Sequence, residues 1–344
     1  MISDGHGDYF APVPDPIDAA SGRDGDDLFA ELSMYVHAEH FLERMGQLGL
    51  TQYRCELSTM LANFRSLPDA DDGPYRPLDN AYFTDQCDPA AGVTMLFGQN
   101  FGEVDFAVDA DVIYHELGHG TVALLTPEGL TQPAKRVDGV TNDAAAINES
   151  IADYVSIMLQ HGGDAELAEY VGRFWPAQST PYIRTARNTL RCPQDMIGES
   201  HNDGEPLTAA LWATRARVGA VMDGIVLDML VRLPPDARLE DAAAAVLDAA
   251  ADAQHAGALG ADGVALLRRG STAAACSTAR GSSAISTGSP RAHECTCASA
   301  ATRCCCRFWR AGAAARESVP VTMRSSSSSS STPAAAVIAR RCCW

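Results

Sequence analysis

The chain has 344 residues, of which 46% are hydrophobic, so it is long enough to bury the core of one or two domains. Its formal net charge of −18 argues against the basic surface of a nucleic-acid-binding protein, and no run of about 18 apolar residues is present to span a membrane. The first residues, MISDGHGDYFAPVPDP, lack the basic and apolar parts of a signal peptide, which predicts cytoplasmic retention or a true start further upstream.

The N-terminal region predicts an arm, a helix and an acidic loop. Residues 1–26 are rich in Gly, Pro and Asp and indicate an extended arm. Residues 27–50 predict a helix, because apolar residues recur near the helical period. These apolar residues are Leu28, Leu32, Tyr35, Val36 and Leu42. The loop LPDADDGPYRP (67–77) favours a solvated segment, with calcium binding by Asp69, Asp71 and Asp72 as the alternative.

Strands are predicted before most of the helices. Strand-like segments occupy 80–84, 92–98 and 103–108. Apolar periodicity then predicts helices at 111–125, 143–160, 206–232 and 239–256. Strands followed by helices favour an α+β fold over an alternating βαβ fold.

The composition changes after about Gly270. Nine of the 26 basic residues, two of the 44 acidic residues and eight of the 11 cysteines lie beyond this point. The segment 269–344 is therefore interpreted as a low-complexity tail, either disordered or translated from GC-rich DNA out of frame. Before it only Cys55, Cys87 and Cys192 occur, which allows one disulfide and no disulfide framework.

The stretch YHELGHG (114–120) matches the pattern H-E-x-x-H. His115 and His119 would lie one helical turn apart and could bind one metal ion. Glu116 points away from that line and would reach a metal-bound water instead. An amphipathic helix with two surface histidines is the alternative, but apolar neighbours such as Val112 and Val122 predict a buried helix whose histidines need partners.

A catalytic zinc site takes three protein ligands, so one more is required. The segment INESIADY (147–154) places Glu149 and Asp153 on one side of the next predicted helix. One carboxylate could bind the metal while the other accepts the free ring N–H of a ligand histidine. A solvated acidic face is the alternative, although the helix is otherwise largely apolar.

H-E-x-x-H followed by N-E-x-x-x-D resembles the thermolysin-like metallopeptidases, the gluzincins, and in its 29-residue gap between His119 and Glu149 the fungalysin branch. The resemblance covers roughly residues 27–260. It implies zinc on His115, His119 and Glu149, with Glu116 as general base. It also implies Asp153 as the hydrogen-bond partner of His115.

Two further stretches resemble this family. LDNAYFTDQ (78–86) is similar to the cleft-edge strand that pairs with extended peptide, which implies substrate binding by Asn80 and Ala81. GESHNDGEPLTAALW (198–212) is similar to the segment whose histidine stabilises the oxyanion, which implies this role for His201. In this family a tyrosine also helps to bind the oxyanion, and this chain has no tyrosine between residues 120 and 150. A substrate carbonyl could be held by one of three arginines that the sequence does not separate: Arg184, Arg187 and Arg191.

These observations together predict a zinc endopeptidase with a two-lobed, thermolysin-like α+β fold. Residues 27–125 would form a β-containing lobe that ends in the HExxH helix at the cleft, and residues 126–268 a mainly helical lobe. The resemblance implies an extracellular or cell-envelope protein that acts on peptide substrates. The alternatives are a zinc aminopeptidase, another zinc hydrolase, and an inactive binding protein or truncated gene product. Four other histidines are expected to be structural or exposed: His37, His40, His161 and His255.

Overall fold

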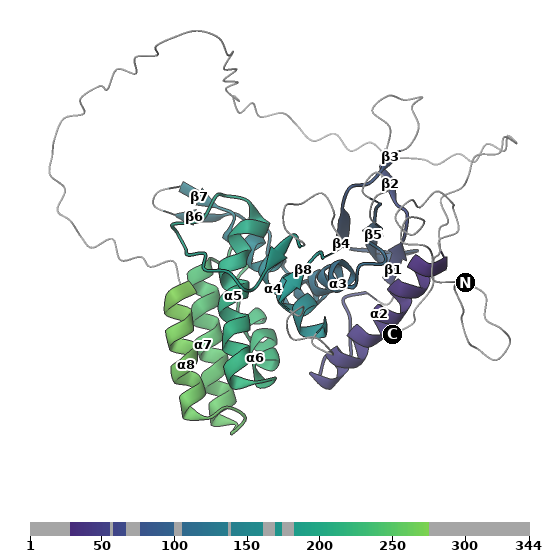
Figure 1. The fold of residues 1–344 in the computed structure, drawn as a ribbon. Helices are drawn as coiled ribbons and strands as arrows, with labels where there is room; N and C mark the ends of the chain where they lie inside the picture. The colour runs from purple at the N-terminus through teal and green to yellow at the C-terminus, as the bar shows by residue number, and fades with distance from the viewer. Residues whose placement is uncertain are drawn as a thin grey trace, which may run out of the picture. The chain divides into compact units, whose positions relative to one another are not determined.

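The computed structural model describes residues 28–55, 58–66, 76–99, 105–136, 139–160, 169–173 and 182–274, and these form a mixed α+β fold that is mostly helical (Figure 1). The helices are α2 (Leu28–Gln47), α3 (Ala110–Leu125), α4 (Asp143–Gln160), α5 (Ser200–Val218), α6 (Val221–Leu230), α7 (Leu239–His255) and α8 (Ala261–Ala274). The predicted arm, the aspartates of the 67–77 loop, His161 and the tail beyond α8 lie outside the described residues.

The described strands are short. They are β1 (Ser58–Leu61), β2 (Arg65–Ser66), β3 (Arg76–Pro77), β4 (Ala81–Asp88), β5 (Gly92–Phe97), β6 (Ala134–Arg136), β7 (Gly139–Thr141), β8 (Tyr170–Val171) and β9 (Arg184–Thr185). One sheet has three strands in the order β1-β5-β4, with β1 parallel and β4 antiparallel to β5. The other strands pair two by two, as β2-β3, β6-β7 and β8-β9. Among the strands that the structure describes, β4 therefore lies at the edge of its sheet.

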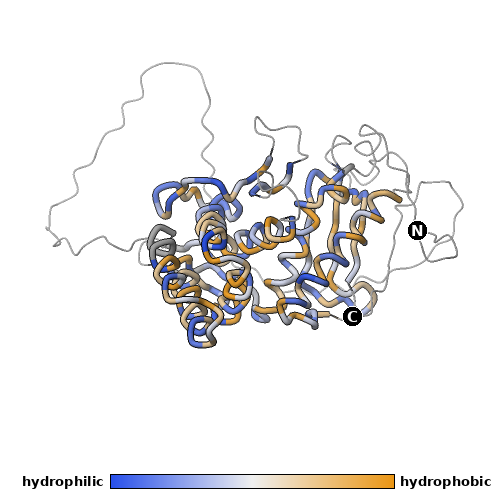
Figure 2. The backbone as a smooth tube through the Cα atoms, turned by 60° about the horizontal axis from the view of Figure 1, so that its bottom comes forward, coloured by the Kyte–Doolittle hydropathy of each residue, from blue (hydrophilic) through white to orange (hydrophobic). Residues whose placement is uncertain are grey.

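Helices α3 and α4 form the centre of the described structure. Helix α3 packs against α2, α4 and β4, and α4 also packs against α5. Most side chains of α4 are buried, including Ile147, Ile151 and Ile157. Figure 2 shows hydrophobic stretches mainly in the helices and in the strands of the sheet. The hydrophobic effect thus fixes the two helices that carry the HELGH and NESIAD motifs.

Helix α2 confirms the helix predicted at 27–50, although most of the apolar residues that marked its period are not the ones that it buries. Its buried apolar side chains are Ala30, Met34, Phe41 and Met45, whereas Val36 is 51% exposed. Helix α2 also contacts α3, because the Nδ1 atoms of His37 and His40 lie 2.7 and 2.9 Å from the Tyr114 hydroxyl. These two histidines are structural, and His255 is exposed, as expected.

Two predicted elements are wrong in their extent. The expected helix at 206–232 begins earlier and is divided into α5 and α6, because Gly219 adopts a φ of 81° and ends α5. The described part of the expected strand at 103–108 is a turn, in which the Asp105 carboxylate accepts a hydrogen bond from the Ala107 N–H at 2.9 Å. Helix α8 crosses the boundary expected between residues 268 and 269.

A buried cluster of ion pairs and hydrogen bonds around Asp223 connects α6 to the neighbouring helices. Its carboxylate accepts hydrogen bonds from Arg44, from Arg215 at 2.6 Å and from the Tyr154 hydroxyl at 2.8 Å. Those partners come from α2, α5 and α4. Since Asp223 is 1% exposed, its charge depends on these partners, and the cluster holds α4 and α5 in register.

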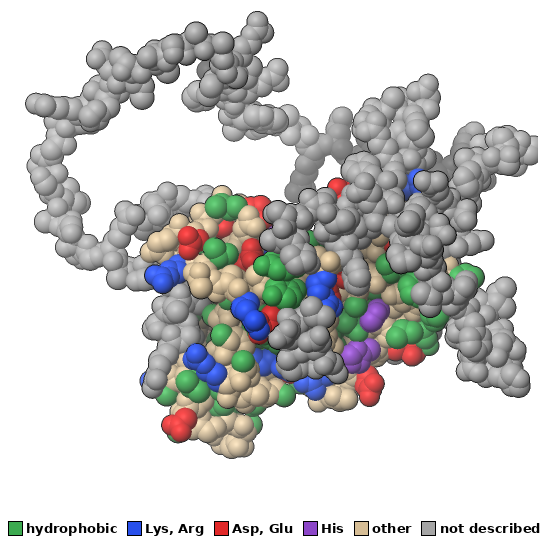
Figure 3. All heavy atoms as spheres, in the orientation of Figure 1, with side chains coloured by type: hydrophobic (Ala, Val, Ile, Leu, Met, Phe, Trp, Pro, Cys, Tyr) green, Lys and Arg blue, Asp and Glu red, His purple; other side chains and the backbone are tan. Residues whose placement is uncertain are grey.

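One predicted disulfide possibility is realised, because Cys55 and Cys87 are bonded with their Cα atoms 5.6 Å apart. It links the residues before β1 to the end of β4. On the face drawn in Figure 3, acidic and basic side chains are interspersed. Among the described helices, none combines the length and hydropathy that crossing a membrane requires.

Candidate metal centre

The two motif histidines lie on the buried helix α3. Asp109 is its N-cap residue, and the Asp109 carboxylate accepts a hydrogen bond from the Asp111 N–H. His115 and His119 are one turn apart, and their rings are nearly perpendicular. Their Nε2 atoms are 3.1 Å apart. The helix therefore presents two ring nitrogens to one point, as the i, i+4 spacing predicts.

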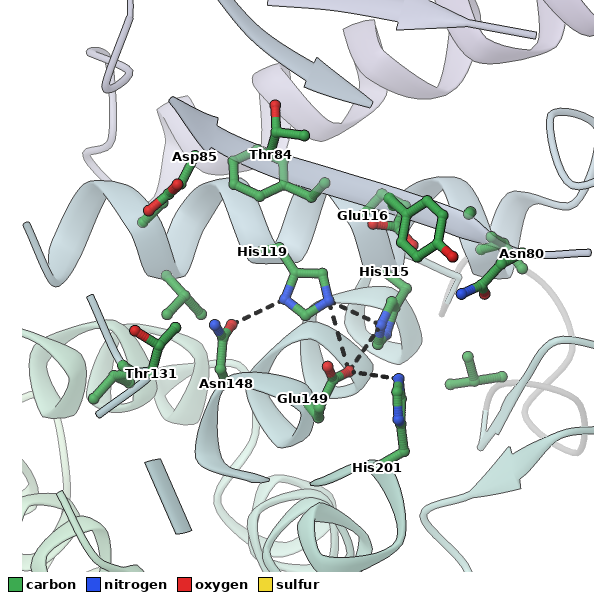
Figure 4. Close-up of a pocket in the computed structure, with 18 of the residues that line it drawn as sticks. Asn80, Thr84, Asp85, His115, Glu116, His119, Thr131, Asn148, Glu149 and His201 are labelled. Carbon is green, nitrogen blue, oxygen red and sulfur yellow. Dashed lines mark hydrogen bonds and ion pairs between the residues drawn. The ribbon is translucent and has the colours of Figure 1, made fainter. Parts of the chain in front are cut away.

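Glu149 on α4 completes the set. Its Oε2 lies 3.2 Å from His115 Nε2 and 3.6 Å from His119 Nε2 (Figure 4). Ligand atoms at 2.0–2.1 Å from a tetrahedral ion are separated by about 3.3 Å, so these three distances match three edges of one tetrahedron. His115, Glu149 and His201 also offer ligand atoms within 4.8 Å of one another. The described residues could therefore hold a metal ion here.

The outer ring nitrogens of the two histidines have fixed partners. His115 Nδ1 donates to Asp153 Oδ1 at 2.8 Å, and His119 Nδ1 donates to Asn148 Oδ1 at 2.9 Å. With the protons on Nδ1, both Nε2 atoms keep lone pairs directed at the ligand position. The role predicted for Asp153 therefore fits the geometry. Asn148 was missed, although it directly precedes Glu149 in the motif.

Arg184 on β9 extends the hydrogen-bond chain that runs from His115 to Asp153. Its guanidinium binds both carboxylate oxygens of Asp153 at 2.7 Å. Of the three arginines left open by the sequence, Arg184 lines the cavity in front of the site, whereas Arg187 pairs with Glu169 and Arg191 is exposed. Arg184 is thus the one of these three that borders the cavity, and its bidentate pair with Asp153 holds its guanidinium in one orientation.

The ionisable side chains of the site shift one another's pKa values. Burial would raise the pKa of Glu149, but the contact with His115, when that ring is protonated, and the other nearby histidines lower it to about 2. Burial and the neighbouring His115 lower the pKa of His119 to about 4. Burial would lower the pKa of His115, but its hydrogen bond to Asp153 and its contact with Glu149 raise it to about 10, so this ring and Arg184 balance the carboxylates of Glu149 and Asp153. A metal ion held at Nε2 would take the place of the second ring proton.

Glu116 supplies a carboxylate oxygen with no protein partner. The side chain is 5% exposed, and its Oε2 has no hydrogen-bond partner within the described structure. Burial raises the pKa of this carboxyl to about 7. Buried polar atoms are nearly always hydrogen-bonded, so an unpartnered oxygen lining a cavity indicates a position for a water or ligand.

His201 lies in the first turn of α5 rather than in a loop before it. Its Nε2 is 3.3 Å from Glu149 Oε2, and its Nδ1 is 2.7 Å from Glu199 Oε1. Glu199 also caps α5 by accepting from the Asn202 N–H at 2.9 Å. One carboxylate therefore fixes both the start of the helix and the histidine ring, a role that the sequence did not reveal.

A cavity of about 590 Å³ lies in front of these residues. It is lined by both motif histidines, Glu116, Glu149 and His201, and along one side by residues 80–85, which include Asn80 and Ala81. Apolar side chains such as Val112, Leu130 and Ile183 cover much of the remainder. All the residues predicted for the site thus border one cavity, apart from Asp153, which acts from behind His115.

Two glycines set the spacing of the three helices that carry the site. A Cβ on Gly118 of α3 would lie 2.7 Å from the Cα of Ala152, and one on Gly204 of α5 would lie 2.6 Å from the carbonyl oxygen of Ala146. Both contacts are with the backbone of α4, so neither can be relieved by a side-chain rotation. Helices α3 and α5 therefore pack closely against two sides of α4, and this packing places Glu149 next to the two histidines.

We expect Gly118→Ala to force α3 and α4 apart, lowering the free energy of unfolding by about 1–3 kcal/mol. Separation of His115 and His119 from Glu149 should also reduce the affinity of the folded protein for a metal ion such as zinc about tenfold or more. Urea unfolding and zinc titration measure the two effects. Gly224→Ala is the control, since a Cβ there meets nothing within 4 Å. Parental zinc affinity in Gly118→Ala would contradict this role.

No protein-family model matches this chain, and no curated protein matches it either.

Proposed function

We propose that the protein is a zinc-dependent endopeptidase of the thermolysin-like type. One observation carries the proposal: His115 Nε2, His119 Nε2 and Glu149 Oε2 lie 3.1, 3.2 and 3.6 Å apart, and each ring has its proton held on the far nitrogen. Two imidazoles and one carboxylate are the ligand set of catalytic zinc in metallopeptidases, which keep the fourth position open. A bound zinc would supply a water of lowered pKa and would polarise the scissile carbonyl.

Glu116 is the proposed general base. Glu116 lines the same cavity as the ligand residues, its Oε2 has no protein partner in the described structure, and its side chain is rotated along α3 away from the His115–His119 line. A carboxylate there can take a proton from a water held at the site and return it to the leaving amine. The burial of Glu116 keeps this carboxylate in one orientation.

His201 is proposed to stabilise the oxyanion. Since Glu199 accepts its Nδ1 proton, a second proton on the ring can only sit on Nε2, which points toward Glu149 and the cavity. Imidazolium Nε2–H would then donate a hydrogen bond to the developing negative oxygen. Helix α5, fixed by its cap at Glu199, holds this donor in place before substrate arrives.

The free edge of β4 is the proposed peptide-binding edge. The Gly98 N–H donates to the Asn80 carbonyl at 3.0 Å, so the backbone groups of Asn80 face β5. In an antiparallel ladder the neighbouring residues alternate, which turns the N–H and C=O groups of Ala81 and Phe83 toward the cavity. An extended peptide could therefore add to β4 by main-chain hydrogen bonds.

Two further features support this assignment. The cavity follows β4 past the ligand atoms in both directions, from Asn80 to Asp85, which suits cleavage within a chain better than removal of a terminal residue. The Cys55–Cys87 disulfide is typical of exported proteins, which supports an extracellular or cell-envelope location. In the proposed two-lobed fold, α3 forms the floor between the sheet and the helices.

Metal analysis of the purified full-length protein, together with a protease assay, tests the proposal. About one zinc per chain is expected for a three-ligand catalytic site. Casein should be cleaved at internal bonds, a chelator should abolish cleavage, and added zinc should restore it. Metal without cleavage would favour a binding protein, release of single N-terminal residues would favour an aminopeptidase, and absence of bound metal would overturn the proposal.

A further inference from the structure

Strand β4 carries a carboxylate that the proposed chemistry does not use. Asp85 lines the same cavity as His119 and Phe83, and it follows the last regularly paired residue, Thr84. In Figure 4 Asp85 and Asn80 lie toward opposite ends of β4, with the motif histidines between them. A peptide added along β4 would therefore pass Asp85 on the His119 side of the site.

The charge of Asp85 is not neutralised by the described protein. Its side chain is exposed, and no Lys, Arg or His nitrogen lies within 4 Å of its carboxylate in the ranges that the structure describes. Arg54, at the nearby end of α3, donates to the carbonyls of Ala123 and Pro127 instead. Arg184, the arginine that lines the cavity, is held by Asp153.

Among the described residues that line this end of the cavity, the other side chains carry no charge apart from those of the metal site. Thr84 directly precedes Asp85 on β4, and Thr126 and Thr131 also line the cavity. A bound peptide would thus meet one unpaired negative charge on the His119 side. The formal charge of −18 for the whole chain further favours cationic over acidic ligands.

We propose that Asp85 is a specificity-determining residue that selects peptides with a lysine or arginine on the His119 side of the scissile bond. This inference rests on the proposed peptide-binding edge of β4. The basic side chain would pair with the Asp85 carboxylate while main-chain bonds to Ala81 and Phe83 hold the peptide. An acidic side chain at the same place would be repelled, so discrimination has an attractive and a repulsive part.

Exposed ion pairs contribute modestly, so the effect on each basic substrate should be about two- to fivefold in kcat/KM. The ratio between a lysine and a glutamate substrate combines attraction and repulsion, and should reach roughly five- to tenfold at low ionic strength. It should shrink as salt is added, because the pair is solvent-accessible.

The experiment compares peptides that differ at one position, which carries Lys, Gln or Glu and is scanned along both sides of the cleaved bond. Full-length zinc-loaded protein and Asp85→Asn are measured in parallel. We expect the Lys-to-Glu ratio of kcat/KM to fall to near one in Asp85→Asn, with the Gln peptide as the neutral reference. Asp88→Asn is the control, because the Asp88 carboxylate caps its own turn through Ala90 and Ala91 and does not line the cavity.

Fluorescence anisotropy of the same labelled peptides gives a second measurement that needs no turnover. Tighter binding of the Lys peptide that is lost in Asp85→Asn would support the inference even if the parent cleaved nothing, in which case the proposed endopeptidase activity alone would fail. A Lys-to-Glu ratio that is the same in the parent and in Asp85→Asn, by cleavage or by binding, would overturn the role of Asp85.

Discussion

Glu116→Gln is expected to retain about one zinc per chain while its kcat falls by about 10²- to 10⁴-fold, the range for loss of a positioned general base. Glutamine keeps the size of the side chain and its place on α3, but it cannot take a proton from water. The ligand atoms of His115, His119 and Glu149 are untouched by the change. Metal analysis and single-substrate kinetics on the same preparation measure the two properties together.

A control variant separates this effect from general damage. Glu43 is exposed on α2, so Glu43→Gln should leave kcat and zinc content at parental values. Loss of zinc from Glu116→Gln would show that Glu116 acts on metal binding, and full activity in that variant would exclude it as the base.

Glu149→Ala is expected to lose zinc. Removal of an outer partner of a metal ligand already costs about 10- to 100-fold in affinity, so removal of a ligand should exceed a hundredfold. Cleavage should disappear with the metal. The measurement is a competition titration with a chromophoric chelator, accompanied by urea unfolding to confirm that the variant is folded.

Glu43→Ala serves as the matched exposed control for this variant as well. Parental zinc affinity in Glu149→Ala would show that the third ligand is wrong. His201 would then be the next candidate, because its Nε2 lies 3.3 Å from the Glu149 oxygen. The double variant Glu149→Ala/His201→Ala would decide between these ligand sets by whether zinc is lost only when both are changed.

Local sequence signals predicted the helices that carry the site. Helix α4 spans 143–160 as expected, because its apolar period is uninterrupted. The i, i+4 spacings within HELGH and within NESIAD predicted which side chains share a helix face, and the structure brings them together. These predictions depend on backbone geometry over one or two turns, which the sequence specifies directly.

Features that depend on distant segments were not predictable in the same way. The parallel pairing of β1 with β5 joins residues far apart in the chain, and four-residue strands carry little periodicity. Arg184 reaches Asp153 across 31 residues, so the sequence could not separate it from Arg187 or Arg191. By contrast, Gly219 after a basic last turn is a known helix end, and it could have divided α5 from α6.

The close approach of α3 and α4 restricts which residues can occupy the two x positions of H-E-x-x-H in this chain. Its two unspecified positions are not equivalent: Leu117 is an apolar core position, whereas Gly118 lies against the backbone of Ala152. For a chain in which α3 and α4 approach as closely as they do here, the first position is open to apolar residues and the second requires glycine. Such a chain also requires glycine three residues after the histidine of α5, where Gly204 meets the other side of α4.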